Sequence, residues 1–394
     1  MLSDIYHKFI RFKTDAALRR RSNSEKSELS NILNEKQKYK LFITNNHFGG
    51  TRDYEKNSVI GSDAVVLRRE GYYSDDDKYF EVSNNGNSIL ISIDHVFDIW
   101  NYHFSKITVS TLIDFDNILR LLSSIIEYKQ NHTGCVITYL VHDFHCICPN
   151  CNLFVNGQYC SVNCSKYRCS NFQKFSGSID DWRNIWGAFF SNIDEIRCFS
   201  NSSRDIIAEV YESAKDRITV VPHDLSYCKN TKINGVNQLP LHIGVVGTVF
   251  GPPKGKQVVS NIIDKFGNSI RITLIGSPWW RFPNFKRKVN CLGPYKRDKL
   301  QSIIEKKGIS FVLFPSLWPE TFSYLVSELI MMDIPLACFN LGAQAEKVKN
   351  YDRGIVVDNE LELWALLDEL NAAGTWNAFV SKHSRTTDGK KLRG

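Results

Sequence analysis

The sequence lacks the features that mark fibrous, membrane-spanning or secreted chains. Its 23 glycines and 11 prolines in 394 residues are too few for a fibrous or low-complexity protein. No uninterrupted run of about 18 apolar residues is present, which argues against a membrane-spanning helix. The first residues, MLSDIYHKFIRFKTDAALRRR, contain neither an apolar stretch nor a small-residue cleavage site, so we expect no secretory signal. The net charge of +7 is mild and gives no argument for a nucleic-acid partner.

The composition is typical of a globular protein, and without a secretory signal we expect a cytoplasmic location. Hydrophobic residues make up 43% of the chain and charged residues 23%, so the chain can bury a sizeable core. Its length corresponds to two or three domains. We predict a basic leader helix over 1–38, a first domain over 39–230, a linker over 231–240, a second domain over 241–372 and a loosely ordered tail over 373–394.

Hydrophobic patterns predict alternating strands and helices in both domains. In the first domain we expect strands at 40–44, 135–144 and 217–225, the first followed by a glycine-containing turn and a helix. In the second domain the predicted elements are, in chain order, strand 241–249, helix 256–266, strand 270–276, helix 297–307, strand 309–315, helix 320–332, strands 334–340 and 354–358, and helix 360–370. Such alternation is typical of parallel sheets in doubly wound α/β domains. Two such domains in tandem predict a ligand cleft between them.

Six of the eleven cysteines fall within one stretch, 146–169. Cys148 and Cys151 form a C-x-x-C pair, and Cys160, Cys164 and Cys169 follow at short spacing. Without an export signal we expect thiols rather than disulfides. Thiolates at such spacings hold zinc in structural sites, but cysteines in an irregular loop also pack as small apolar residues. Both interpretations stay open on the sequence.

Two basic segments are candidates for contact with a membrane. Residues 1–38 place apolar side chains among lysines and arginines, in the pattern of an amphipathic helix on an anionic membrane surface. The aromatic and basic stretch PWWRFPNFKRK, at 278–288, fits the same role. For each segment the alternative is a helix or turn packed on its own domain.

The segment 314–346 has the pattern that points most directly to chemistry. After a buried strand and a proline-punctuated turn, Glu320 is predicted to open a helix with an apolar stripe toward the core. Glu328 lies beside that stripe, where a carboxylate is costly unless it accepts hydrogen bonds from hydroxyls or amides. The backbone N–H groups of Thr321, Phe322 and Ser323 would form the helix N-terminus. Such a terminus at the carboxyl end of a strand is a site for a diphosphate.

This segment resembles the retaining family-4 glycosyltransferases. The resemblance lies in Glu320 and Glu328 with seven residues between them, in the proline turn before them, and in Gly342 after the next strand. It covers most of residues 40–370 and is densest from 241 to 346. It implies the GT-B fold, in which two Rossmann-like, doubly wound α/β domains face a central cleft. It also implies transfer of a sugar from a nucleoside-diphosphate sugar.

Further residues match that family individually. Lys254 and Gly255, after the first strand of the second domain, match its basic residue against the donor diphosphate. Gly49 and Gly50 match a glycine turn that lets the first domain approach the donor. His142 matches a strand-end histidine that the family places against the transferred sugar. A histidine satisfied within the core or a turn is the alternative for this position.

One position departs from the family pattern. The family often has an arginine directly after the glycine that follows the first strand of the second domain. Here Thr248 stands after Gly247, so one cation of the phosphate clamp is missing. Lys256 could take its place. The departure leaves open a degenerate protein that binds a nucleotide sugar without turnover.

The resemblance implies how the site would work. Lys254 and the N–H groups of 321–323 would stabilise the leaving diphosphate. Glu328 would accept hydrogen bonds from the ribose hydroxyls, and Glu320 and His142 would hold the donor sugar from opposite walls. The anomeric configuration would be retained without a covalent enzyme intermediate, unlike hydrolases with paired carboxylates. No cofactor or divalent metal is implied for the reaction.

The cysteine-rich stretch that begins VHDFHCICPNC resembles a subgroup of bacterial enzymes that build O-antigen and related surface polysaccharides. This implies a polyprenyl-diphosphate-linked or other glycan as acceptor, and a peripheral location on the inner face of the cytoplasmic membrane. A different class of function is a zinc-containing nucleic-acid-binding module. Only Lys166 and Arg168 are basic within the cysteine cluster, and a module of this kind leaves the pattern of Lys254, Glu320 and Glu328 unexplained. We therefore favour the glycosyltransferase.

Overall fold

The structure is a computed structural model and divides into two compact units. It describes residues 29–46, 50–61, 63–69, 79–93, 95–113, 115, 117–162, 177–228, 231, 233, 240–249, 251–267, 269–277, 289–374 and 376–379. The first unit comprises Met1–Cys151 with Val162–His223, and the second comprises Asn152–Ser161 with Asp224–Gly394. Most of the predicted leader helix and of the tail, and the whole of 278–288, lie outside the described residues.

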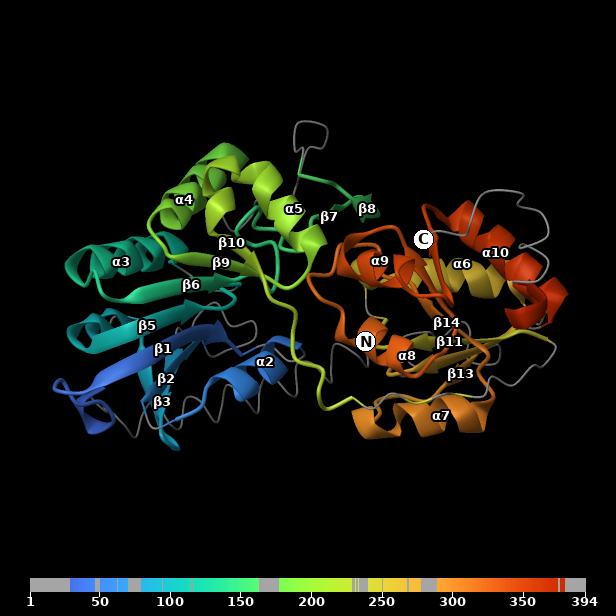
Figure 1. The fold of residues 1–394 in the computed structure, drawn as a ribbon, viewed down its shortest axis with the longest axis horizontal. Coiled ribbons are helices and arrows are strands. Elements are labelled where there is room, and N and C mark those ends of the chain that lie inside the picture. Colours follow the sequence, from blue (N-terminus) through green and yellow to red (C-terminus); the bar gives the residue numbers. More distant parts are fainter. Residues whose placement is uncertain are drawn as a thin grey trace. The chain divides into compact units, whose positions relative to one another are not determined.

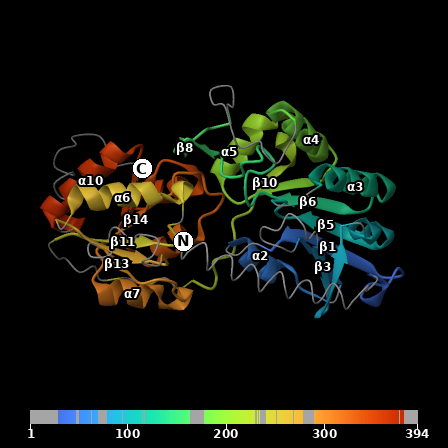
Figure 2. The same ribbon diagram turned by 180° about the vertical axis from the view of Figure 1, so that it is seen from behind.

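The first unit is built on an eight-stranded sheet with the order β10-β9-β6-β5-β1-β2-β3-β4. The strands are β1 (Lys38–Asn45), β2 (Ala64–Arg69), β3 (Tyr79–Asn84), β4 (Asn87–Ser92), β5 (His103–Val109), β6 (Val136–Leu140), β9 (Glu195–Cys198) and β10 (Ile218–Val220). The described helices are α2 (Gly50–Ser58), α3 (Ile118–Asn131), α4 (Ile179–Ser191) and α5 (Asn201–Val210), with short 3₁₀ helices η1 (Leu29–Asn31), η2 (Val96–Asn101) and η5 (Glu212–Arg217). Helix α2 lies on one face of the sheet, while α3, α4 and α5 lie on the other (Figures 1 and 2).

One strand of this unit departs from the parallel arrangement that the sequence predicts. Strand β3 is antiparallel to both of its neighbours, β2 and β4. The two-residue turn between β3 and β4 consists of Asn85 and Gly86, whose φ angles are 48° and 84°. Positive φ at both positions is the geometry that Asn-Gly favours in a tight hairpin. The sequence NNGN therefore carried the signal for this hairpin.

The second unit contains a six-stranded, fully parallel sheet with the order β13-β12-β11-β14-β15-β16. The strands are β11 (His242–Val246), β12 (Arg271–Ile275), β13 (Asn290–Cys291), β14 (Phe311–Phe314), β15 (Leu336–Phe339) and β16 (Gly354–Val357). The described helices are α6 (Lys256–Phe266), α7 (Leu300–Lys307), α8 (Tyr324–Met331), α9 (Gly342–Lys349) and α10 (Glu360–Ala373), with 3₁₀ helices η6 (Pro252–Lys254) and η9 (Arg297–Lys299). A separate antiparallel pair is formed by β7 (Phe154–Val155) and β8 (Gln158–Tyr159).

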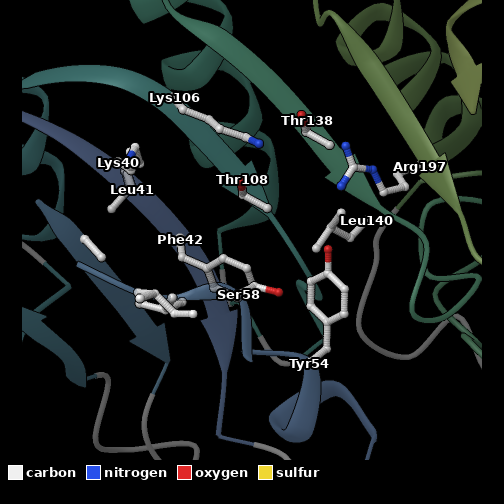
Figure 3. A pocket seen from close by; sticks show the side chains of 13 residues that line it. Lys40, Leu41, Phe42, Tyr54, Ser58, Lys106, Thr108, Thr138, Leu140 and Arg197 are labelled. Carbon is white, nitrogen blue, oxygen red and sulfur yellow. The ribbon is translucent and has the colours of Figure 1, made fainter. Parts of the chain in front are cut away.

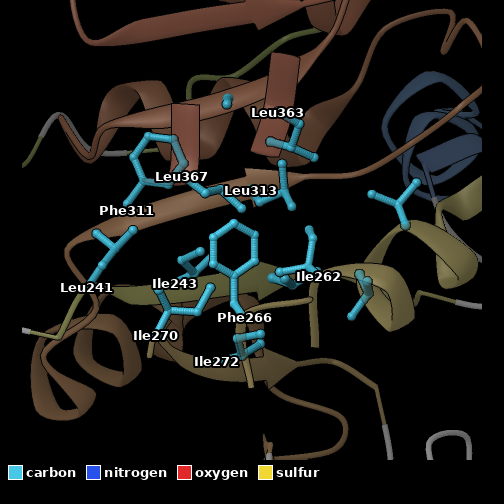
Figure 4. Close-up of a cluster of buried hydrophobic side chains, with 14 of the residues drawn as sticks. Leu241, Ile243, Ile262, Phe266, Ile270, Ile272, Phe311, Leu313, Leu363 and Leu367 are labelled. Carbon is cyan, nitrogen blue, oxygen red and sulfur yellow. The ribbon is translucent and has the colours of Figure 1, made fainter. Parts of the chain in front are cut away.

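Both faces of the second sheet are buried, which explains its nearly continuous apolar strands. On one face α6 and α10 enclose a cluster that includes Ile243, Phe266 and Leu367 (Figure 4). On the other face α7, α8 and α9 enclose a cluster that includes Val246 and Leu329. Because successive side chains of a strand point to opposite faces, β11 contributes to both clusters. Numbered from β11, the strand order is 3-2-1-4-5-6, the doubly wound arrangement predicted from the sequence.

The predicted helix 320–332 is wrong at its first residues. Helix α8 begins at Tyr324, and Ser323 before it has left-handed backbone angles, φ 59° and ψ 79°. A residue with such angles cannot continue a right-handed helix toward the N-terminus. Glu320, Thr321 and Phe322 therefore lie in the loop that connects β14 to α8.

Candidate functional site

The candidate site lies where the strand order of the second sheet reverses. Strands β11 and β14 are neighbours, but the chain leaves them toward helices on opposite faces, α6 and α8. At such a switch point the loops at the carboxyl ends of the strands leave room for a ligand. The backbone N–H of Leu317 donates to the carbonyl of Pro253 at 2.8 Å, which joins the loop after β14 to the loop after β11.

The predicted residues Lys254 and Glu320 come together across these two loops. The Lys254 Nζ atom lies 2.5 Å from Glu320 Oε1 and 5.0 Å from the centre of the Trp318 ring. The Glu320 side chain is 12% exposed, whereas that of Lys254 is 41% exposed. The lysine thus neutralises a largely buried carboxylate and still presents its ammonium group to solvent, where it can meet an anionic ligand.

Gly255 allows this approach because a side chain would not fit there. Its φ is +76°, and an added Cβ would lie 2.0 Å from the carbonyl oxygen of Pro315. The close contact of the two loops therefore requires a glycine, both for its backbone angles and for the missing side chain.

Helix α9 fixes the backbone of Glu320. The Glu320 N–H donates to Gln344 Oε1 at 3.0 Å, and its carbonyl accepts from the Ala343 N–H at 2.9 Å. The fully buried Gln344 also donates to the Trp318 carbonyl at 2.8 Å. An added Cβ on Gly342 would lie 2.6 Å from the Glu320 nitrogen. Sequence reasoning missed α9 and Gln344, although Gly342 was already part of the resemblance.

The donors predicted at 321–323 are displaced by the late start of α8. Thr321, Phe322 and Ser323 are buried, but they form the loop before the helix. The backbone N–H groups of the first turn of α8 belong instead to residues 324–326. Their place after β14 still puts a helix N-terminus at the carboxyl edge of the sheet.

Glu328 faces a cavity of about 570 Å³ in the second unit. Its side chain is 5% exposed; it accepts a hydrogen bond from the Tyr227 hydroxyl and forms an ion pair with Arg297 Nε, both at 2.9 Å. The apolar wall of the cavity includes Met331 and Met332. Burial and the adjacent Glu328 carboxylate raise the pKa of Tyr227, so the phenol remains a donor. Tyr227 and Arg297 come from distant segments, and no local pattern in the sequence indicated them.

Lys347 is a buried cation that sequence reasoning also missed. Its Nζ donates to Ser327 Oγ at 2.6 Å and to the Ser323 carbonyl at 3.3 Å, and it lies 3.3 Å from the centre of the Phe322 ring. Burial lowers the pKa of Lys347 to about 7, while Glu320 and Glu346 act in the opposite direction.

The substitution Lys347→Met is expected to stabilise the protein most below pH 7. Because the pKa is lowered in the folded state, the unfolded chain binds more protons between about pH 7 and pH 10. Lys347 therefore lowers the free energy of unfolding below pH 7, and this destabilisation disappears as the pH rises from about 7 to about 10. Denaturation of both proteins from pH 6 to pH 10 measures this difference. Lys349→Met, on an exposed residue of the same helix, is the control. A difference that does not change with pH would contradict the account.

His142 follows the end of β6 in the first unit, at the end of the predicted strand. Its ring stacks on Phe199 at 4.7 Å and on His223 at 5.5 Å, and it meets the edge of Tyr54 at 5.1 Å. The side chain is partly exposed although its Nε2 atom is buried. Burial lowers the pKa of His142 to about 3, which keeps the imidazole neutral. Gly50 is the first residue of α2, and Gly49 lies outside the described residues.

The cysteine cluster remains only a predicted metal site. The Asn150 N–H lies 3.4 Å from Cys148 Sγ, and Cys148 and Cys160 are buried while Cys151 is partly exposed. Among the described residues no three metal-ligating side chains gather. Cys164 and Cys169 lie outside the described residues, so the full set of five thiols is not tested. No helix in the described part of the chain is long and apolar enough to span a membrane.

Comparison with known proteins identifies the fold. No protein-family model and no curated protein matches the chain. Among solved structures, HepE of Anabaena in complex with UDP matches with a TM-score of 0.53 at 12% identity, over 88% of this chain and 93% of that one. Sucrose-phosphate synthase of Thermosynechococcus elongatus matches with a TM-score of 0.57 at 13% identity, over 88% and 93%. The chain has the GT-B fold. This confirms the predicted GT-B class, and identities this low show the fold alone.

Proposed function

We propose that the protein is a retaining glycosyltransferase that uses a nucleoside-diphosphate sugar. The observation that carries the proposal is the meeting of Lys254 and Glu320 at the switch point of a GT-B unit. The cation and the helix N-terminus at this edge would bind the diphosphate of a donor, and the carboxylate would bind its sugar hydroxyls. That HepE was solved with UDP and with UDP-glucose supports this class of ligand.

The nucleoside would occupy the cavity beside Glu328. Its carboxylate already accepts a hydrogen bond from Tyr227 and pairs with Arg297. Ribose hydroxyls would take over as donors to this carboxylate when the nucleotide binds. The volume of about 570 Å³ is in the usual range for small-molecule sites.

In the proposed reaction, the bond between the anomeric carbon and the β-phosphate oxygen breaks, and the diphosphate leaves with that electron pair. Lys254 and the N-terminus of α8 would stabilise the growing negative charge. The acceptor hydroxyl would form its new bond on the same face of the sugar, and its proton would pass to the departing phosphate oxygen. Glu320 would orient the sugar hydroxyls, with His142 as a neutral hydrogen-bonding partner of the same sugar.

The biological setting is also part of the proposal. The cysteine-rich stretch and the basic segments support a role in bacterial surface polysaccharide or O-antigen synthesis, with a polyprenyl-diphosphate-linked or other glycan as acceptor. We further propose peripheral contact with the inner face of the cytoplasmic membrane, through residues 1–38 and 278–288. A structural zinc on Cys148, Cys151 and the following cysteines is also part of the proposal.

Turnover of candidate donors tests the proposed function. Purified protein is incubated with UDP-, GDP- and dTDP-sugars and a lipid-linked glycan, and the released nucleoside diphosphate is measured. We expect release from one nucleotide class, and a product whose anomeric configuration by NMR equals that of the donor. An inverted product would overturn the retaining mechanism. Donor binding without any release would instead indicate a degenerate transferase.

A further inference from the structure

A polar hollow of about 260 Å³ opens on the α2 face of the first sheet. Its walls come from α2 and from strands β1, β5, β6 and β9 (Figure 3). The polar side chains toward its centre are contributed by Tyr54, Lys106, Thr108, Thr138 and Arg197. None of these residues has a role in the donor site of the second unit.

Strand β5 shows that this face is not built for apolar packing. Ile107 and Val109 are fully buried on the opposite face, whereas Lys106 and Thr108 line the hollow. Strands of a parallel sheet covered on both faces are usually apolar throughout. Strand β5 therefore presents polar side chains to this face of the sheet.

Two lysines stand side by side on this face. Lys40 of β1 and Lys106 of β5 are direct register partners. Lys40 forms an ion pair with Asp63 at 2.9 Å. Lys106 has no ion-pair or hydrogen-bond partner for its side chain among the described residues. Like charges on adjacent strands cost stability, so a bound anion is the natural complement of Lys106.

Arg197 lines the same hollow from β9, on the far side of β6 from Lys106, and is held in place by Glu195. Its Nε and Nη2 atoms donate to the two oxygens of Glu195 at 2.9 Å and 2.8 Å. Figure 3 shows the Lys106 ammonium, the Arg197 guanidinium and the Tyr54 hydroxyl directed into the same hollow. None of the described lining residues carries a carboxylate.

We propose that this hollow binds the phosphate group of a small molecule. Lys106 and Arg197 would donate to its oxygens, and the hydroxyls of Thr108 and Tyr54 would complete the set. A bound water needs only about 10–15 Å³ of such volume, so the hollow also has room for the organic part of a phosphate ester. Residues 1–28 carry more basic than acidic side chains and do not complement the two lysines. The proposal does not depend on the glycosyltransferase function.

Calorimetric titration with inorganic phosphate, glucose 6-phosphate and glucose tests the site. We expect both phosphate probes to bind wild-type protein and glucose not to bind. Tighter binding of the ester would assign an organic phosphate, and equal binding would assign the free anion. The affinity should fall about tenfold or more in Lys106→Met, which loses a charge-assisted hydrogen bond. Lys56→Met, on an exposed residue of α2 outside the hollow, should bind as wild type.

A second variant, Lys254→Met, tests whether this site is independent of the donor site. In Lys254→Met the binding of glucose 6-phosphate should persist, because that lysine lies in the other unit. Thermal unfolding checks that Lys106→Met is folded, and relief of the lysine pair should make it no less stable than wild type. The proposal is overturned if Lys106→Met binds as wild type, if glucose binds as tightly as its phosphate, or if neither phosphate probe binds.

Discussion

Replacement of Glu320 by alanine should lower the rate of sugar transfer by about 10²–10³-fold, the usual cost of losing one group that stabilises a transition state. The side chain is largely buried at the switch point, and its backbone is fixed by Gln344 and Ala343. In the variant, a water molecule in place of the carboxylate would lack this fixed orientation toward the sugar hydroxyls. The measurement is kcat with the donor that the wild type turns over.

The same variant should remain folded. Removal of Glu320 leaves Lys254 without its carboxylate, but that lysine is 41% exposed and can be solvated, so the loss in unfolding free energy should be about 1 kcal/mol. Glu305→Ala, on an exposed residue of α7, is the control and should keep the wild-type kcat. A wild-type kcat for Glu320→Ala would contradict the proposed role of Glu320 in catalysis.

The second large effect is expected for Gly255→Ala. The new methyl group would lie 2.0 Å from the Pro315 carbonyl oxygen, at a φ of +76° that alanine also disfavours. The loops after β11 and β14 would have to separate, which would move Lys254 away from Glu320. We expect a loss of more than about 3 kcal/mol in unfolding free energy and loss of donor binding.

Gly86→Ala is the matched control for this effect. Gly86 also has a positive φ, +84°, close to that of Gly255, but an added Cβ would meet nothing within 4 Å. Its cost should be limited to the backbone strain, about 1–2 kcal/mol. Chemical denaturation and calorimetry of both variants make the comparison. Equal losses for the two would show that backbone strain, and not the close approach of the loops, explains the requirement for glycine at position 255.

The fold of the second unit was largely accessible from the sequence. Its strands are buried on both faces and so appear as short apolar runs between turns. The predicted helix 256–266 coincides with α6, because glycines bound it at both ends. The first unit was less predictable. Helix α4 was missed, although Ser178 and Asp181 form a capping box at its start.

The residues of the candidate site could be proposed from the sequence, but their geometry could not. Lys254, Glu320 and Glu328 were proposed from their spacing and from the resemblance to a known family, and the structure brings Lys254 and Glu320 together. The start of α8 was misplaced because Ser323 takes left-handed angles in a loop held by α9, and no local pattern encodes that long-range contact. Lys347 was not found for the same reason, since its neighbours are 20 or more residues away in the chain.

The most direct test of the central claim is calorimetric titration of the 394-residue protein with UDP-, GDP- and dTDP-sugars. It is repeated with Glu328→Gln, and with Lys106→Met to keep the proposed phosphate site apart from the donor site. The account predicts that one nucleotide class binds with a stoichiometry of one, that Glu328→Gln weakens this binding about tenfold or more, and that Lys106→Met leaves it unchanged. Absence of binding across the whole panel, or binding that Glu328→Gln does not alter, would contradict a nucleotide-sugar site in the second unit.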